Sequence, residues 1–162
     1  MQYLAIAQAT VLVALANGAP VIAKKIFGSR FARPLDGGVK FLDRQPLFGS
    51  SKTIRGILVS LVVATAGAPF VGLEPKLGAL AAAAAMAGDL FSSFVKRRLR
   101  LKPSSRALGL DQVPESLFPL LALRDALALT AADIALAVAV FLVGELVLSR
   151  LLYKIHLRDE PY

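Results

Sequence analysis

The sequence predicts an all-α integral membrane protein with about five transmembrane helices and a polar cavity open to the cytoplasm. Three observations lead to this prediction. Of the 162 residues, 56% are hydrophobic, and the mean hydropathy of +0.64 indicates more apolar surface than a soluble domain of this size could bury. The apolar residues gather in segments of about the length that a bilayer requires. The basic residues cluster on one side of the resulting layout.

Five apolar segments are expected to form spans within a single domain, residues 1–162. Their expected bounds are about 3–23, 56–73, 77–95, 115–130 and 131–153. A helix of about 18 residues is roughly 27 Å long, close to the hydrocarbon core of about 30 Å. The first segment is interpreted as a retained helix rather than a signal peptide, because no Lys or Arg precedes Lys24. The fourth is short and carries Arg124 and Asp125, so a broken or half-inserted segment is the alternative there.

The basic residues predict the orientation of the spans. Of the 19 Lys and Arg residues, eight lie in 24–55, six lie in 96–106 and three lie near the C-terminus. All 17 fall on one side if five spans alternate. The positive-inside rule therefore places the loops 24–55 and 96–114 and the C-terminus in the cytoplasm, and the N-terminus outside the cell membrane. Part of this charge is expected to contact anionic lipids of the bilayer.

The residue inventory excludes several classes of site. The chain has no cysteine, which excludes disulfides, thiolate metal sites and Cys nucleophiles. Its single histidine, His156, cannot supply a Ser-His triad or a His-rich zinc site. The net charge of +8 would suggest a nucleic-acid partner for a soluble protein. For a membrane protein the placement of charge matters more, and no nucleic-acid partner is expected.

Topology does not explain the polar groups inside the third expected span. Asp89 lies there, and an acid near the bilayer centre costs about 2.5–3.5 kcal/mol on insertion scales. On a helix, Asp89 shares one face with Ser92, Ser93 and Lys96. This face runs from the membrane interior to the cytoplasmic surface, and its functional interpretation is a metal or phosphate site. The alternative is an ion pair that serves packing, either between Asp89 and Lys96 or between helices.

Further carboxylates lie beside cations in the expected cytoplasmic loops or at span ends. They are Asp36, Asp43, Asp111 and Glu115. Because Asp111 and Glu115 are four residues apart, a helical turn would place them on one face. Oxygen ligands of this kind hold Mg²⁺, and Lys and Arg hold phosphate oxygens. The combination predicts a site for a divalent cation together with phosphates.

The segment 46–56, PLFGSSKTIRG, predicts an anion site at the start of the second span. Gly49 and the two serines offer N–H and hydroxyl donors, and Lys52, Thr53 and Arg55 follow at a helix start. The segment does not match a Walker A loop, which requires glycines in two positions that hold other residues here. The alternative is a helix cap with flanking charges.

A second irregular stretch lies inside the first span. Asn17, Gly18 and Pro20 predict an unwound or kinked helix near its cytoplasmic end, and an ordinary proline kink is the alternative. In the third span, the small residues predict close helix packing. They are Gly78, Ala79 and the run 81–85.

Five motifs occur in order along residues 12–120. They are ANGAP (16–20), LDGGVKFLD (35–43), PLFGSSKTIRG (46–56), GDLFSSFVKRRL (88–99) and GLDQVPESLFP (109–119). Together they resemble the integral-membrane CDP-archaeol synthase family, whose members are relatives of the CDP-diacylglycerol synthases. The resemblance implies a nucleotidyltransferase in which CTP and a membrane lipid with a terminal phosphate give CDP-lipid and pyrophosphate, with Mg²⁺ as cofactor. It leaves open whether the lipid is an isoprenoid ether or a diacylglycerol phosphate.

The resemblance also implies roles for individual residues. The implied metal ligands are Asp89, Asp111 and Asp43, with Glu115 and Asp36 as further candidates. The residues implied to bind CTP or the lipid phosphate are Asn17, Ser50, Ser51, Lys52, Thr53, Arg55, Ser92, Ser93, Lys96 and Arg97. The residues expected to act in catalysis are Lys52, Asp89, Lys96 and Asp111.

A non-enzymatic alternative is a small membrane transporter or scaffold whose basic loops bind anionic lipid. A transporter would be expected to show an internal duplication with helix breaks at matching positions. The two large loops share only their basic character, so the sequence favours the enzyme. A homodimer is compatible with the sequence, and no motif requires one.

Overall fold

The structure of this protein is a computed structural model, and its regular elements are helices. The structure describes residues 1–102, 105, 107 and 109–154. In chain order its elements are α1 (Tyr3–Phe27), α2 (Ile54–Gly67), the short 3₁₀ helix η1 (Ala68–Val71), α3 (Pro75–Arg98), α4 (Gln112–Ala122) and α5 (Ala131–Lys154). No strand occurs among these elements, so the predicted all-α class is confirmed. His156, Arg158 and Arg106 lie outside the described residues.

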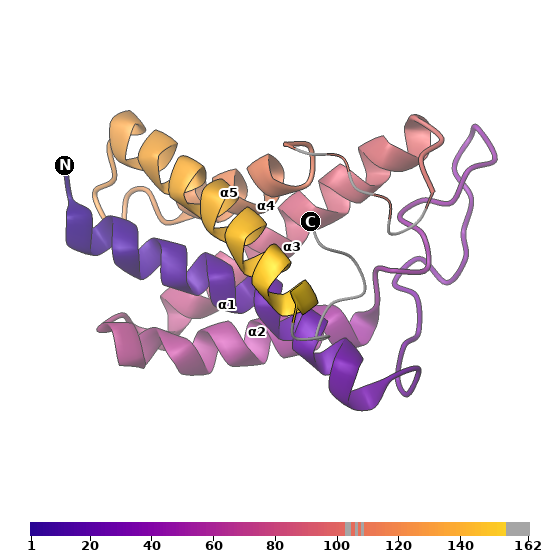
Figure 1. Cartoon of the computed structure of the whole chain (residues 1–162), viewed down its shortest axis with the longest axis horizontal. Helices are drawn as coiled ribbons and strands as arrows, with labels where there is room; N and C mark the ends of the chain where they lie inside the picture. Colours follow the sequence, from indigo (N-terminus) through magenta and orange to yellow (C-terminus); the bar gives the residue numbers. More distant parts are fainter. Residues whose placement is uncertain (103–104, 106, 108, 155–162) are drawn as a thin grey trace.

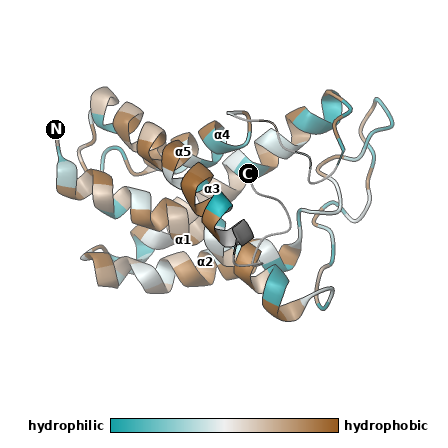
Figure 2. Cartoon of the chain, in the orientation of Figure 1, coloured by the Kyte–Doolittle hydropathy of each residue, from teal (hydrophilic) through white to brown (hydrophobic). Residues whose placement is uncertain are grey.

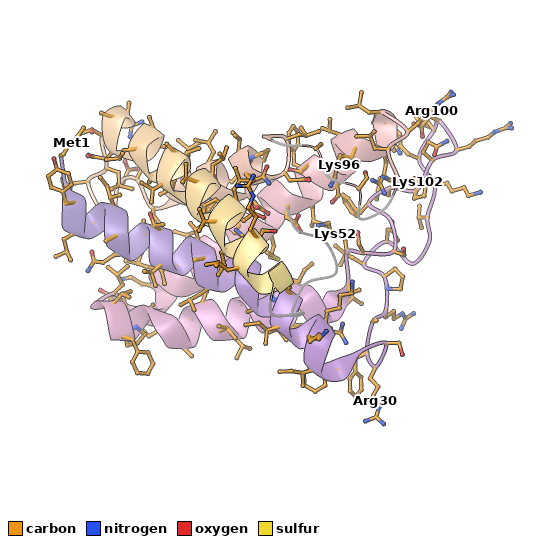
Figure 3. The ribbon with its side chains drawn as sticks, viewed as in Figure 1. Met1, Arg30, Lys52, Lys96, Arg100 and Lys102 are labelled. Atoms are coloured by element: carbon orange, nitrogen blue, oxygen red, sulfur yellow. The ribbon has the colours of Figure 1, made fainter. Side chains whose placement is uncertain are left out.

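The first three helices run back and forth along the long axis of the bundle (Figure 1). The loop after α1 and the end of α3 lie at one end, which we call the basic end, and the N-terminus lies at the other. Figure 3 shows Arg30, Arg100 and Lys102 at the basic end, far from Met1. The predicted gathering of both basic loops at one end is therefore confirmed. Which end faces the cytoplasm stays a prediction.

Four helices in the described part of the chain are long and apolar enough to cross a membrane. They are Tyr3–Phe27, Ile54–Val71, Pro75–Arg98 and Ala131–Leu151. Figure 2 shows the hydrophobic residues along these helices and the hydrophilic ones concentrated in the loops of the basic end. Four of the five expected spans are thus confirmed, with ends that differ from the expected bounds by a few residues.

The expected full span over 115–130 is wrong. Helix α4 has 11 residues, a length of about 16 Å, and ends at Ala122. The next residues form turns around Arg124 and Asp125, and Ala128 has a positive φ of 50°. The half-inserted alternative describes α4 better. The chain still returns to the N-terminal end before α5 begins, because Gln2 Nε2 donates to the Ala128 carbonyl at 2.9 Å.

Helix α1 is continuous through Pro20, so the predicted unwinding at 17–20 is wrong. Proline lacks the N–H that would bond to the Ala16 carbonyl one turn earlier. The Ser60 hydroxyl of α2 donates to that carbonyl at 2.8 Å, and Ser60 is fully buried. A neighbouring helix therefore replaces the lost backbone hydrogen bond, and the helix needs no break.

Small residues bring α3 into backbone contact with two neighbours. A Cβ on Gly78 would lie 2.2 Å from the Ala64 carbonyl oxygen of α2, and one on Gly88 would lie 2.1 Å from the Pro114 carbonyl oxygen of α4. Between them, Ala81, Ala82 and Ala85 are fully buried. This confirms the predicted close packing of the third span.

Candidate functional site

The first ion pair of the site joins the start of α2 to α3. Lys52 Nζ lies 2.6 Å from both carboxylate oxygens of Asp89, and the two side chains are 21% and 23% exposed. Lys52 directly precedes Thr53, whose hydroxyl caps α2 by accepting from the Gly56 N–H at 3.1 Å. Lys52 thus extends from the last loop residue before this cap. The structure therefore pairs Asp89 with a lysine of the loop before α2 rather than with Lys96, and a metal-binding role for Asp89 stays a prediction.

A second ion pair joins the end of α3 to the start of α4. Lys96 Nζ lies 2.6 Å from Asp111 Oδ1, and the Lys96 side chain is only 8% exposed. The same ammonium group donates to the Ser105 carbonyl at 2.9 Å. Asp111 Oδ2 accepts from the Ala107 N–H at 3.1 Å, which holds Ala107 beside the pair. Figure 3 shows Lys52 and Lys96 closer to the middle of the bundle than Arg100 and Lys102.

Glu115 lies near both pairs. Its carboxyl group is within electrostatic range of Asp89, Asp111 and Lys52, and also of Glu145 on α5. Glu145 is not among the predicted site residues, although it is an acid within an apolar span, the same signal that singled out Asp89. In the region of the predicted polar cavity, the structure shows charged side chains joined by the ion pairs Lys52–Asp89 and Lys96–Asp111. Its opening to the cytoplasm stays a prediction.

Asn17 positions α4 from the first helix. Pro119 removes the N–H that would bond to the Glu115 carbonyl. Asn17 Nδ2 lies 3.5 Å from that carbonyl oxygen and donates to it. The ANGAP motif therefore touches the backbone of the residue whose side chain faces the acids.

The inner face of α3 is polar and buried, as the spacing predicted. Ser92 and Ser93 are almost fully buried, and the Ser92 hydroxyl donates to the Gly88 carbonyl at 3.0 Å. Arg97 is also buried, and its Nη2 donates to the Lys102 carbonyl at 2.8 Å. Its Nε is buried and makes no hydrogen bond to any residue that the structure describes.

Asp36 organises the first loop. Its Oδ1 accepts from the Gly38 N–H at 3.0 Å, and its Oδ2 accepts from the N–H groups of Phe48 at 3.0 Å and Gly49 at 2.9 Å. Burial raises the pKa of Asp36, but these backbone donors together outweigh it and hold the pKa below its usual value. The structure therefore gives Asp36 a loop-folding role. A metal-binding role for it stays a prediction.

Asp43 lies in an ion pair with Arg98. Arg98 Nε is 2.9 Å from Asp43 Oδ2, and Oδ1 accepts from the Gln45 N–H at 3.0 Å. Arg98 Nη2 also donates to the Pro46 carbonyl at 2.8 Å. A metal-binding role for Asp43 stays a prediction, and its observed partner, Arg98, is not among the predicted site residues.

The remaining predicted binders lie along the loop. Arg55 Nη1 donates to the carbonyls of Gly28, at 3.0 Å, and Arg30, and so closes the end of α1. Ser50 and Ser51 are exposed. Ser50 lines a cavity of about 230 Å³ within the loop. The other residues that line it are Pro34, Asp36, Gly38, Lys40, Pro46 and Gly49.

No three acidic or histidine side chains of the described residues converge closely enough to hold a metal by themselves. Mg²⁺ in nucleotide sites is usually bound by one or two carboxylates together with phosphates and waters. Asp89 and Asp111 each stand opposite a lysine ammonium, so a positive charge already balances each carboxylate. Both residues offer the oxygen ligands that Mg²⁺ prefers, and their use as metal ligands stays a prediction.

Comparison with known proteins places this chain. A family model described as CarS-like, CDP-archaeol synthase, matches residues 70–162. The CDP-archaeol synthase of Pyrobaculum calidifontis is 32% identical over 157 residues, 91% of either chain. The chain belongs to the CDP-archaeol synthase family. The resemblance seen in its motifs is thereby confirmed.

Other members show higher identity over shorter stretches. The CDP-archaeol synthase of Hyperthermus butylicus is 41% identical over 105 residues, 60% of this chain and 59% of the relative. That of Pyrococcus furiosus is 40% identical over 107 residues, 60% of each chain. In these two alignments the chain spans about three fifths of the relative's length. A solved structure of an intramembrane enzyme for archaeal membrane lipid biosynthesis superposes with a TM-score of 0.71 at 29% identity, covering 85% of this chain and 90% of that one. This match supports an intramembrane fold for the chain and its placement as a multi-pass membrane protein.

Proposed function

We propose that this protein transfers CMP from CTP to the phosphate of a membrane lipid with isoprenoid ether chains, giving CDP-lipid and pyrophosphate. The observation that carries the proposal is the pair of Lys–Asp contacts, Lys52–Asp89 and Lys96–Asp111, inside the bundle. They occur in a family whose curated members are named CDP-archaeol synthases. The lipid class is taken from those names.

The reaction needs little covalent help from the protein. An oxygen of the lipid phosphate attacks the α-phosphorus of CTP, and a new P–O bond forms there. The bond from the α-phosphorus to the oxygen that bridges to the β-phosphate breaks, and pyrophosphate leaves with that electron pair. Because the attacking phosphate is already ionised, no general base is required. Catalysis then consists of positioning and of neutralising charge on the phosphates.

Lys52 and Lys96 are suited to bind the phosphates. Each ammonium group now neutralises a carboxylate, and each can turn to a phosphate oxygen when Asp89 and Asp111 gain another cationic partner. Asp89 and Asp111 would hold Mg²⁺ together with phosphate oxygens. Bound Mg²⁺ would supply charge neutralisation for the phosphates and the leaving pyrophosphate.

Nearby donors support the same assignment. The buried Arg97 offers its Nε to a phosphate, and Ser93 is buried on the same face of α3. Asn17 acts on the site through the Glu115 backbone. CTP is a cytoplasmic nucleotide, so the basic end would face the cytoplasm.

The test is a product assay with matched ion-pair variants. The purified protein is incubated with labelled CTP, Mg²⁺ and either an isoprenoid ether lipid phosphate or phosphatidic acid. We expect CDP-lipid from the isoprenoid acceptor, and at least a hundredfold loss in Asp89→Asn. The control is Glu74→Gln, because Glu74 forms an equally short but exposed pair with Lys76, 2.6 Å between Oε2 and Nζ. Absence of CDP-lipid from both acceptors would refute the proposal and would favour a transporter or scaffold.

A further inference from the structure

Arg98 fastens the first loop to the end of α3. We propose that Arg98 is a positioning residue for the reaction: it keeps this loop docked while Lys52 leaves Asp89 to bind the substrate phosphates. The inference rests on the proposed function. It assigns to Arg98 a task that differs from those of Lys96 and Arg97, its neighbours in the chain.

The part of the loop that Arg98 contacts is a small hairpin, residues 39–47. The Phe41 N–H donates to the Gln45 carbonyl at 2.8 Å, and the Leu47 N–H donates to the Val39 carbonyl at 3.0 Å. Arg98 reaches the turn of this hairpin through its contacts with Asp43 and Pro46. These two contacts attach the hairpin to the end of α3.

Aromatic rings complete the contact. The guanidinium carbon of Arg98 lies 4.7 Å from the ring centre of Phe41 in the hairpin and 4.8 Å from that of Phe94 on α3. The two rings also meet edge to face, with centres 5.3 Å apart. A planar guanidinium can lie against aromatic rings and donate from its edge at the same time, whereas a lysine ammonium cannot. The contacts of Arg98 that the structure describes are thus with the hairpin and with Phe94, while its Nε and Nη1 form no hydrogen bond with a described residue.

The hairpin and Lys52 belong to one hydrogen-bonded body. Asp36 accepts from the N–H groups of Phe48 and Gly49, directly after the hairpin. The Leu35 N–H donates to the Lys52 carbonyl at 2.8 Å, and an isolated bridge pairs Pro34 with Thr53. A displacement of the hairpin therefore shifts the backbone from which the Lys52 side chain extends.

This body is tied to α3 at two levels. Lys52 holds it at Asp89, and Arg98 holds it nine residues later, about 13.5 Å further along the helix. In the proposed reaction the first tie opens, because Lys52 exchanges the Asp89 carboxylate for phosphate oxygens. The second tie then determines whether Lys52 is presented at the correct place.

The kinetic test compares three variants at the end of α3. Arg98→Met should lower kcat/KM for CTP by about 10- to 100-fold, mainly through a higher KM, because Lys52 is no longer presented to the phosphates. Arg98→Lys should restore only part of this loss. Arg100→Met removes the same charge from an exposed side chain two residues later and should stay within about twofold of the wild type. Equal kinetics for Arg98→Met and the wild type would overturn the proposal.

A distance measurement tests the anchoring without reference to activity. Because the chain has no cysteine, spin labels can be placed at Leu42→Cys in the hairpin and Leu80→Cys on α3, both at exposed positions. The distance distribution should be narrow in the wild type, in Lys52→Met and in Arg98→Met, and broad only when both substitutions are combined. A narrow distribution in the double variant would overturn the anchoring. If the double variant has a broad distance distribution but the wild-type protein makes no CDP-lipid, the proposed function is refuted and the anchoring role of Arg98 is retained.

Discussion

Replacing Gly88 by alanine should force α3 and α4 apart. The new Cβ would lie 2.1 Å from the Pro114 carbonyl oxygen, 2.5 Å from its carbon and 2.9 Å from Glu115 Cα. Ordinary contacts between such atoms are about 3.5 Å, so the helices must separate by about 1 Å. All three atoms belong to the backbone, so no side-chain rotation can relieve the overlap.

The stability cost follows from that overlap. Overpacking costs about 1–3 kcal/mol, and backbone partners place Gly88→Ala at the upper end of this range. The higher helix propensity of alanine returns about 1 kcal/mol. The net loss of about 2 kcal/mol corresponds to a fall in Tm of about 4–8 °C for a chain of this size. Turnover should fall by about a hundredfold, because Gly88 precedes Asp89 and a 1 Å misplacement of catalytic groups has that effect.

The assay is thermal unfolding in one detergent, followed by fluorescence-detected size exclusion of a tagged protein. The matched control is Gly144→Ala on α5, where an added Cβ meets nothing within 4 Å. The control should unfold at the wild-type temperature or above and keep full turnover. If Gly88→Ala unfolds within a degree of the wild type and turns over normally, the close contact between α3 and α4 is not what this structure describes.

Three further predictions concern single contacts. Ser60→Ala leaves the Ala16 carbonyl buried without its donor, so it should lower the free energy of unfolding by about 1–3 kcal/mol; an unchanged Tm would contradict the cross-helix replacement at Pro20. Lys52→Ala should reduce turnover at least a hundredfold, whereas Lys76→Ala should leave it unchanged. Of these two lysines, Lys52 contacts an acid of the interior and Lys76 contacts an exposed one. Equal turnover in the two variants would show that Lys52 does not take part in the reaction. The pKa of Asp36 is lower in the folded loop than its ordinary value of 3.8, so the stability it contributes is present above about pH 3.8 and is lost as the pH falls through the folded pKa. The anisotropy of a dye at Leu42→Cys should therefore fall on acidification below that pH, and Asp36→Asn should show a low anisotropy throughout; a flat profile in the wild type would contradict the role of Asp36.

The spans that the sequence predicted well are those that the bilayer dictates. Apolar length and the position of cations fixed α1, α2, α3 and α5 to within a few residues. The fourth segment was overestimated because apolar residues resume at Ala126, after Arg124 and Asp125, whereas the backbone already turns at Leu123. Apolar composition does not reveal such a turn. The unwinding expected near Pro20 failed because the rescuing donor, Ser60, comes from another helix.

The charged groups of the site were all visible in the sequence, and their pairing was not. Helix spacing placed Asp89 and Lys96 on one face, but the structure pairs Asp89 with Lys52 and Lys96 with Asp111. These partners depend on how two loops fold back onto α3. Arg98 was not predicted as a site residue for a related reason. The positive-inside rule already accounts for a cation at the end of a span, so its sequence position gives no sign of a further role. Only the folded hairpin distinguishes it from Arg100.

The fate of the individual phosphates of CTP tests the central claim most directly. The protein, Mg²⁺ and an isoprenoid ether lipid phosphate are incubated with CTP labelled at either the α- or the γ-phosphate. CMP transfer predicts that the α-label enters the lipid, that the γ-label leaves as pyrophosphate in equal amount, and that Asp89→Asn does neither. Label from the γ-phosphate in the lipid, or no label from either position, would contradict it.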